Sequence, residues 1–221
     1  MTGMVSASTV AILGAGKSGT AIARQALAAG YRVRIASSGP AERTRMVTGI
    51  VTPGATATDI DKAADEADIV ILATPLRALH RLPLQTLGGR IVIDVMNYWP
   101  PVDGTLPEFE DTARPSSLIV ADTLPATARL VKTLNHIGYH EIEELARPTG
   151  HPDRIGLAVA GDDPDVVATV TGFVDDLGFD PVIAGRLATS APLQPGAVIF
   201  GANLPAPQLR EALHAQPSRV R

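Results

Sequence analysis

The chain of 221 residues contains no cysteine, and this absence excludes disulfide bonds and thiolate ligands for metal ions. Its five histidines are scattered along the sequence. Only His136 and His140 lie four residues apart, and a glycine stands between them where a metal-binding helix would have to run. We therefore expect no metal site.

Long apolar runs and an excess of positive charge are missing as well. No apolar run approaches the ~20 residues that span a bilayer. Lys and Arg number 19 against 23 Asp and Glu, so the net charge is −4, which argues against nucleic acid as a partner. The first eight residues lack the basic and apolar segments of a secretory signal. We expect a cytoplasmic protein that binds neither nucleic acid nor membrane.

Hydrophobic residues make up 45% of the chain, enough for one good-sized core, and apolar segments alternate with helical ones. Strands are expected at residues 10–13, 32–36, 55–58, 68–74, 91–95, 129–134, 155–160 and 181–184. Helices are expected at residues 18–29, 41–47, 59–67, 77–87, 164–177 and 207–215, and over part of 117–124. This order predicts an α/β fold of the Rossmann type, a doubly wound parallel sheet with a small C-terminal α/β extension. We place the dinucleotide-binding domain at residues 1–140 and the small C-terminal part at 141–221.

The most informative segment is the G-x-G-x-x-G run between the first strand and the first helix. It reads Gly14, Ala15, Gly16, Lys17, Ser18, Gly19. Gly14 permits a tight turn, Gly16 has no side chain to hold a pyrophosphate away from the backbone, and Gly19 lets the helix pack closely on the strand. The helix begins with free N–H groups and the positive end of its dipole. This order predicts a dinucleotide site, and the alternative is a structural turn without a ligand.

The turn after the second strand favours NADP over NAD. An NAD site usually has an Asp or Glu there, whereas this chain has Ser37 and Ser38. Both hydroxyls can donate to a 2′-phosphate, and Arg43 or Arg45 can supply positive charge. The alternative is a polar turn followed by solvated arginines.

The carboxyl ends of parallel strands form the ligand-binding edge of such a sheet. We therefore expect Ala73, Thr74 and Pro75 to line the nicotinamide half of the site, with Asn97 following the next strand. Trp99 could stack there on a flat ring or pack under its loop.

The part after the sheet is too short for the helical substrate domain of many dehydrogenases, and it contains no convincing Lys-plus-Asn or His-plus-Asp set. Reduction of an ordinary ketone calls for a general acid, whereas a redox partner that stabilises its own charge needs only positioning. We therefore assign no catalytic side chain.

Over most of residues 9–204 the chain resembles the coenzyme F420-dependent NADP oxidoreductase family. The resemblance is carried by residues 10–19, 37–40, 65–75, 92–97, 131–138 and 160–164. The last two segments contain the motifs V-K-x-x-N and A-G-D-D, which are more specific than the glycine fingerprint.

This resemblance implies hydride transfer between NADPH and the deazaflavin F420, stacked in a cleft between the Rossmann part and the C-terminal part. It implies that residues 15–18 face the pyrophosphate, Ser37 and Ser38 the 2′-phosphate, and Thr74 with Pro75 the nicotinamide. Asn135 of the V-K-x-x-N motif either contacts the cleft or caps its loop. Ser38 stands where many relatives have Arg, and Arg43 is placed to compensate. The resemblance also favours a homodimer.

Two alternatives remain open at this point. One is an NADP-dependent reductase of another acceptor, such as a flavin, a ferric chelate or a small carbonyl. The other is a protein without enzymatic activity that senses NADP(H).

Overall fold

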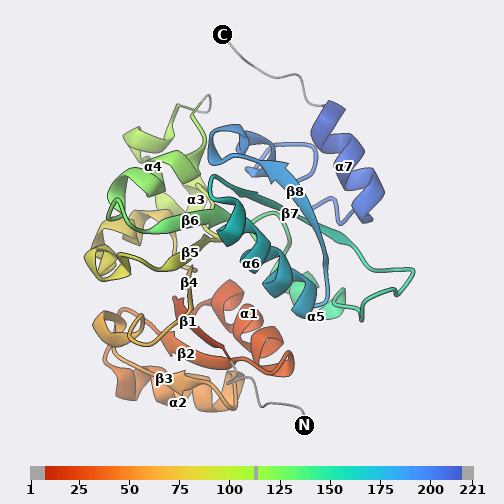
Figure 1. Cartoon of the computed structure of the whole chain (residues 1–221). Coiled ribbons are helices and arrows are strands. Elements are labelled where there is room, and N and C mark those ends of the chain that lie inside the picture. The colour runs from red at the N-terminus through yellow and green to blue at the C-terminus, as the bar shows by residue number, and fades with distance from the viewer. Residues whose placement is uncertain (1–7, 112–113, 216–221) are drawn as a thin grey trace.

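A computed structural model of the chain describes residues 8–111 and 114–215. The expectation that the chain lacks a secretory signal concerns residues that lie almost entirely outside this range. The described strands form a single eight-stranded sheet in the order β3-β2-β1-β4-β5-β6-β7-β8 (Figure 1). They are β1 (Thr9–Leu13), β2 (Arg32–Ala36), β3 (Thr56–Ala57), β4 (Ile69–Leu72), β5 (Ile91–Asp94), β6 (Arg129–Lys132), β7 (Gly156–Gly161) and β8 (Asp180–Gly185).

Helices cover both faces of the sheet. The α-helices are α1 (Lys17–Ala28), α2 (Ala41–Val51), α3 (Pro100–Asp103), α4 (Ser116–Thr123), α5 (Glu141–Glu144), α6 (Pro164–Asp176) and α7 (Ala206–Ala215). The 3-10 helices are η1 (Ile60–Lys62), η2 (Leu76–Arg81), η3 (Leu84–Leu87), η4 (Pro107–Phe109), η5 (Leu187–Thr189) and η6 (Ala191–Leu193). This arrangement confirms the Rossmann-type α/β fold.

Alternate residues of the central strands feed two separate cores, as the two-residue period of a strand requires. Val10 and Ile12 pack with α1 and α6 on one face. Ala11 and Leu13 pack with η2, η3 and α4 on the other. Because both faces are covered, β1 and β4 are apolar throughout, which is typical of buried parallel strands.

The C-terminal part joins the same sheet instead of forming a separate one. All neighbouring strands are parallel except β6 and β7, which pair antiparallel through Val131 with Gly161 and Lys132 with Ala160. The segment between them contains only the short helix α5, so no long helical crossover returns the chain to a parallel register. The boundary expected near residue 140 falls in this segment, while the sheet runs on across it.

Two expected helices are wrong. Residues 59–67 contain only η1 followed by turns, and Glu66 adopts φ 59°, which an α-helix cannot accommodate. Residues 77–87 form η2 and η3, separated at Leu82 and Pro83. Proline cannot donate an amide hydrogen bond and pushes the preceding residue to extended geometry, and Leu82 has φ −76° and ψ 149°.

The start of α6 agrees with its sequence. The side chain of Asp163 accepts hydrogen bonds from the N–H groups of Asp165 and Val166, and Pro164 occupies the first turn. Over residues 8–111 and 114–215, no helix is long and apolar enough to cross a membrane. In the same residues, no three His, Asp or Glu side chains gather into a metal-binding group.

Candidate functional site

The glycine-rich turn joins β1 to α1 at the carboxyl edge of the sheet. Gly14 has φ +133°, and a Cβ added to it would lie 2.2 Å from the carbonyl oxygen of Ala73. A Cβ added to Gly19 would lie 1.8 Å from the carbonyl oxygen of Gly14. These two glycines are therefore required by packing, as expected for a tight turn and for close helix–strand contact.

Gly16 differs from both, because nothing lies within 4 Å of a Cβ added there. It is the N-cap of α1, it makes no side-chain cap, and the first turn contains no acidic residue. Gly16, Lys17 and Ser18 are exposed, so the N-terminal amides of a 12-residue helix face open space. An uncapped helix N-terminus of this kind suits an anionic ligand.

Lys17 is the charged side chain of this turn. Its Nζ lies 3.1 Å from the Tyr139 hydroxyl and 5.0 Å from the centre of the Tyr139 ring. Tyr139 belongs to the loop between β6 and α5. Arg24 of α1 holds α5 in place through two hydrogen bonds to Glu143, of 2.5 and 2.6 Å. The loop after β6 therefore reaches the entrance of the glycine-rich turn.

The turn after β2 presents hydroxyls and a cation. Ser37 Oγ lies 2.7 Å from Thr44 Oγ1, which fixes its side chain, whereas Ser38 is exposed. Arg43 is exposed at the start of α2. The structure also brings Asp59 here, which sequence reasoning missed because it follows 18 residues after Ala41; its Oδ1 accepts from the Ala41 N–H at 3.0 Å. Asp59 therefore holds the first residue of α2 and places a carboxylate near this turn.

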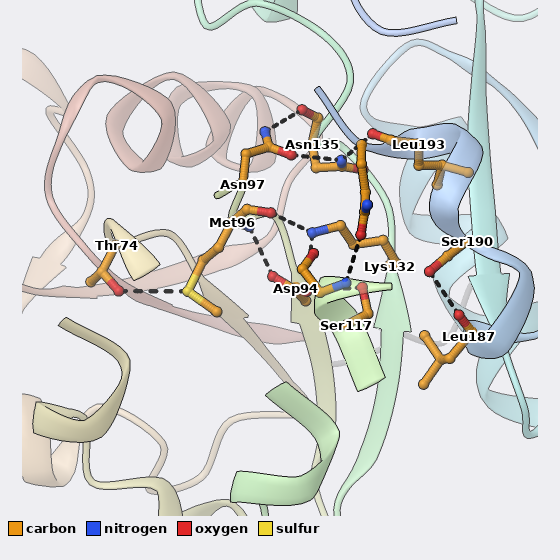
Figure 2. Close-up of polar contacts among 12 residues, drawn as sticks. Thr74, Asp94, Met96, Asn97, Ser117, Lys132, Asn135, Leu187, Ser190 and Leu193 are labelled. Atoms are coloured by element: carbon orange, nitrogen blue, oxygen red, sulfur yellow. Dashed lines mark hydrogen bonds and ion pairs between the residues drawn. The ribbon is translucent and has the colours of Figure 1, made fainter. Parts of the chain in front are cut away.

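The turns after β4 and β5 lie side by side at the same edge (Figure 2). Ala73 donates from its N–H to Leu13 at 2.9 Å, which extends the sheet by one hydrogen bond. Thr74 Oγ1 lies 3.7 Å from Met96 Sδ, and Pro75 is exposed. Trp99 further along is 50% exposed, so it is not packed under its loop.

Asn97 and Asn135 follow the ends of different strands, β5 and β6, and form one cluster with η6. Asn97 Nδ2 donates to the Asn135 carbonyl at 2.7 Å, and Asn135 Nδ2 donates to Asn97 Oδ1 at 2.9 Å and to the Leu193 carbonyl at 2.6 Å (Figure 2). The structure therefore brings together two residues that the sequence separates by 38 positions. It also joins the C-terminal part to the edge where β5 ends.

Lys132 was not among the expected site residues, yet it lies beside this cluster. Its Nζ is 3.0 Å from Asp94 Oδ2 and also donates to the Met96 carbonyl, and the two charged side chains are 1% and 0% exposed. Burial lowers the pKa of Lys132, and the charge of Asp94 opposes this shift. The available signal was a lysine directly after the apolar residues Leu130 and Val131 at the end of a strand, within the V-K-x-x-N motif.

The residues after Lys132 contain unusual polar groups. In the described part of the chain, four buried side-chain polar atoms lack a partner, and three of them belong to Thr133, Asn135 and His136. Leu134 between them has φ 60°. His136 Nε2 accepts from the Ala158 N–H at 3.1 Å, while burial and the charge of Lys132 lower the pKa of His136 to about 4. His136 is therefore neutral near pH 7, and its proton lies on Nδ1.

The larger of the two described hollows, about 390 Å³, lies elsewhere. It is lined by the C-terminal ends of α1 and α6, including Ala29 and Leu177, and so opens at the end of α1 opposite the glycine-rich turn. A smaller hollow of about 80 Å³ lies between Tyr98, Arg114 and Gln194, next to the Asn97 cluster. Neither hollow is lined by the glycine-rich turn, and the candidate site is placed at the edge above β1, β2, β4 and β5 by the uncapped N-terminus of α1 and the strand order.

Comparisons with known proteins bear on the family and the fold of the chain. Residues 9–98 match the family described as NADP oxidoreductase, coenzyme F420-dependent. The solved structure of protein SMa0349 from Sinorhizobium meliloti is similar, with a TM-score of 0.74 and 31% identity over 89% of this chain and 95% of that chain.

Two further proteins are similar over different extents. A protein from Arthrobacter sp. FB24, provisionally assigned as an F420-dependent NADP reductase, has a TM-score of 0.68 and 23% identity over 82% of this chain and 86% of that chain. At that identity the likeness concerns the fold alone. Protein YjhV of Escherichia coli K12 is 46% identical over 48 residues, which cover 22% of this chain and 35% of YjhV. The match therefore spans only about a third of that protein.

The expected fold is thus confirmed, and the expected family is confirmed for residues 9–98. The family match over the glycine-rich turn and the first strands supports an NAD(P)-dependent oxidoreductase. The chain belongs to the same family as SMa0349, and its residues 9–98 belong to the family of coenzyme F420-dependent NADP oxidoreductases.

Proposed function

We propose that the chain transfers a hydride between NADP(H) and coenzyme F420, with NADP(H) bound across the edge above β1, β2, β4 and β5. The observation that carries this proposal is the contrast among the glycines. Gly14 and Gly19 are enclosed by packing, whereas the space in front of Gly16 is open at an uncapped helix N-terminus. A pyrophosphate fits this position because backbone N–H groups and the helix dipole meet there without an intervening side chain.

The preference for the 2′-phosphate rests on the turn after β2. Ser38 and Arg43 are exposed, and the nearby carboxylate of Asp59 already accepts a hydrogen bond from a backbone N–H. Ser37 is fixed by Thr44 and supports the same turn. We assign the adenosine side of NADP to these residues and the pyrophosphate to residues 15–18.

The nicotinamide side is assigned to Ala73, Thr74 and Pro75, with Asn97 and Asn135 fixing the opposite wall. At the closed end of this edge, neither Lys132 nor His136 is an accessible general acid. Lys132 donates to Asp94 and Met96, and the Nδ1–H of neutral His136 is buried and does not reach the open edge. When bound, the nicotinamide supplies the hydride, and the chain's own groups hold the two reactants in register and exclude water.

Lack of an accessible general acid at this end favours a ring acceptor over a small carbonyl, because a deazaflavin or flavin stabilises the added charge itself. The family description favours F420 among such rings. We place the dinucleotide on residues 1–140, and the second cofactor between them and residues 141–221, which meet at Asn135 and Leu193.

The dinucleotide assignment can be tested by binding. We expect NADPH to bind more tightly than NADH, and Arg43→Ala to weaken NADPH about tenfold while leaving NADH unchanged, since one charge-assisted hydrogen bond is lost. Arg45→Ala is the matched control, because Arg45 is exposed on the same helix two residues away. Equal affinities for NADPH and NADH in the wild type would contradict the assignment.

The acceptor assignment needs turnover. With NADPH in excess, we expect loss of the F420 absorbance at a rate proportional to enzyme concentration. A flavin, a ferric chelate and a small carbonyl are assayed as alternative acceptors under the same conditions. Turnover of one of these with F420 inert would replace F420 by that acceptor, and tight NADPH binding without any turnover would indicate a sensor.

A further inference from the structure

The buried pair of Asp94 and Lys132 holds one residue by both of its backbone polar groups. Asp94 Oδ1 accepts from the Met96 N–H at 2.9 Å, and Lys132 Nζ donates to the Met96 carbonyl (Figure 2). The two charged residues are direct neighbours across β5 and β6. Ser117 Oγ donates a further hydrogen bond to Asp94 Oδ2 at 3.2 Å.

Stability alone does not account for this pair. Burying two charges costs several kcal/mol per ion, and a well-packed apolar pair of similar volume is often as stable or more so, by about 1–4 kcal/mol. An apolar pair, however, could not form hydrogen bonds with the N–H and carbonyl of Met96. Met96 lies just beyond Asp94, the last residue of β5 that pairs with β4 and β6. The ion pair therefore fixes the backbone where the strand ends.

Met96 connects this fixed backbone to both walls of the candidate site. Its Sδ accepts from Thr74 Oγ1 in the turn after β4. The next residue, Asn97, makes the reciprocal hydrogen bonds with Asn135. The two turns that flank the assigned nicotinamide position are consequently tied, through Met96, to one buried ion pair.

We propose that Lys132, acting with Asp94 through Met96, is a positioning residue that sets the nicotinamide half of the site while leaving the phosphate half unaffected. This inference rests on the proposed placement of NADP(H). Neither charged group reaches the open edge, so Lys132 acts on the cofactor only by fixing Thr74 and Asn97.

The test compares two ligands that differ in the nicotinamide half. NADPH contains both halves, and 2′,5′-ADP contains only the adenosine and phosphate groups of the first. In Asp94→Asn/Lys132→Met, which removes both charges together, we expect NADPH to lose about tenfold in affinity, the value of one hydrogen bond to a charged group. The affinity for 2′,5′-ADP should stay within about twofold, since no hydrogen bond in the described residues joins the glycine-rich turn to Asp94 or Lys132. Ser117→Ala is the matched control and should preserve both affinities.

A merely structural role would weaken both ligands equally or neither, and either result in a folded variant overturns the proposal. If the double variant does not fold, Met96→Leu decides, because it conserves volume but removes the sulfur that accepts from Thr74. In this variant we expect the affinity for NADPH to fall about threefold relative to the affinity for 2′,5′-ADP. The effect is small because a hydrogen bond to sulfur is weak. An unchanged ratio overturns the proposal. A wild type that binds neither ligand would overturn the proposed function as well, which distinguishes the two failures.

Discussion

The two halves of the candidate site are built in opposite ways. The phosphate half is open: Gly16 faces empty space, α1 is uncapped, and Lys17 and Arg43 are exposed. The half at the ends of β5 and β6 is closed, with Asp94, Lys132 and their partners almost wholly buried. Backbone amides bind a phosphate where they are left unpaired, whereas a flat ring is oriented by walls that cannot move. The comparison predicts that substitutions in the closed half mainly change the free energy of unfolding, whereas substitutions in the open half mainly change ligand affinity.

The largest expected effect is in the closed half. Lys132→Met should lower the free energy of unfolding by about 3–5 kcal/mol, because it leaves the buried carboxylate of Asp94 without a counter-charge. Denaturant unfolding measures this loss. Asp94→Asn/Lys132→Met should recover most of it, and a double variant as unstable as the single one would show that the charge is not the cause.

A pH-dependent loss of stability should come from the same region. The unfolded chain protonates His136 near pH 6.5, whereas the folded chain resists protonation until about pH 4. The contribution of neutral His136 to the free energy of unfolding is therefore fully present above pH 6.5 and is lost as the pH falls toward 4. The total loss is about 3 kcal/mol, at about 1.36 kcal/mol per pKa unit.

His136→Gln isolates this effect from the ordinary carboxylates, since its amide oxygen can still accept from Ala158. The difference in unfolding free energy between wild type and variant should shrink between pH 6.5 and 4. A difference that is independent of pH would contradict the assigned neutral state.

In the open half, two neighbouring glycines should respond differently. Gly16→Ala should weaken NADPH binding about tenfold and change stability by no more than about 1 kcal/mol, because the added methyl enters only the ligand's space. Gly19→Ala should cost about 1–3 kcal/mol of stability, because its Cβ meets the Gly14 carbonyl. Calorimetric titration measures the NADPH affinity and thermal unfolding measures the stability of each variant. An equal decrease in melting temperature in both variants would contradict the predicted difference.

The smallest effect is expected at Tyr139. Tyr139→Phe keeps the ring beneath Lys17 but removes the hydroxyl, so the ammonium is freer to meet a phosphate and NADPH affinity should rise about twofold. Lys17→Met should lower the affinity by a similar factor, and the difference should vanish in 1 M salt. A decrease in affinity in Tyr139→Phe would show that the hydroxyl itself binds the ligand.

Local pattern was sufficient for the elements that have clear ends. The strand–turn–helix order around Gly14 and Gly19 was predicted correctly, as was α6 with its Asp163 cap, because each depends on neighbours within a few residues. Helices 59–67 and 77–87 were predicted wrongly, since alanine-rich and leucine-rich periodicity outweighed the turn at Glu66 and the break at Pro83.

The sequence by itself determined the glycine fingerprint, the hydroxyl-bearing turn after β2 and the alternation of strands and helices, because these are features of contiguous backbone. Only the tertiary structure decided that Lys132 meets Asp94, that Asn135 meets both Asn97 and Leu193, and that β7 joins the sheet antiparallel. The side-chain contacts among these join residues 38 to 58 positions apart. A buried ion pair is defined by what surrounds it, and the lysine at the end of β6 acquires its role only when the neighbouring strand supplies a carboxylate.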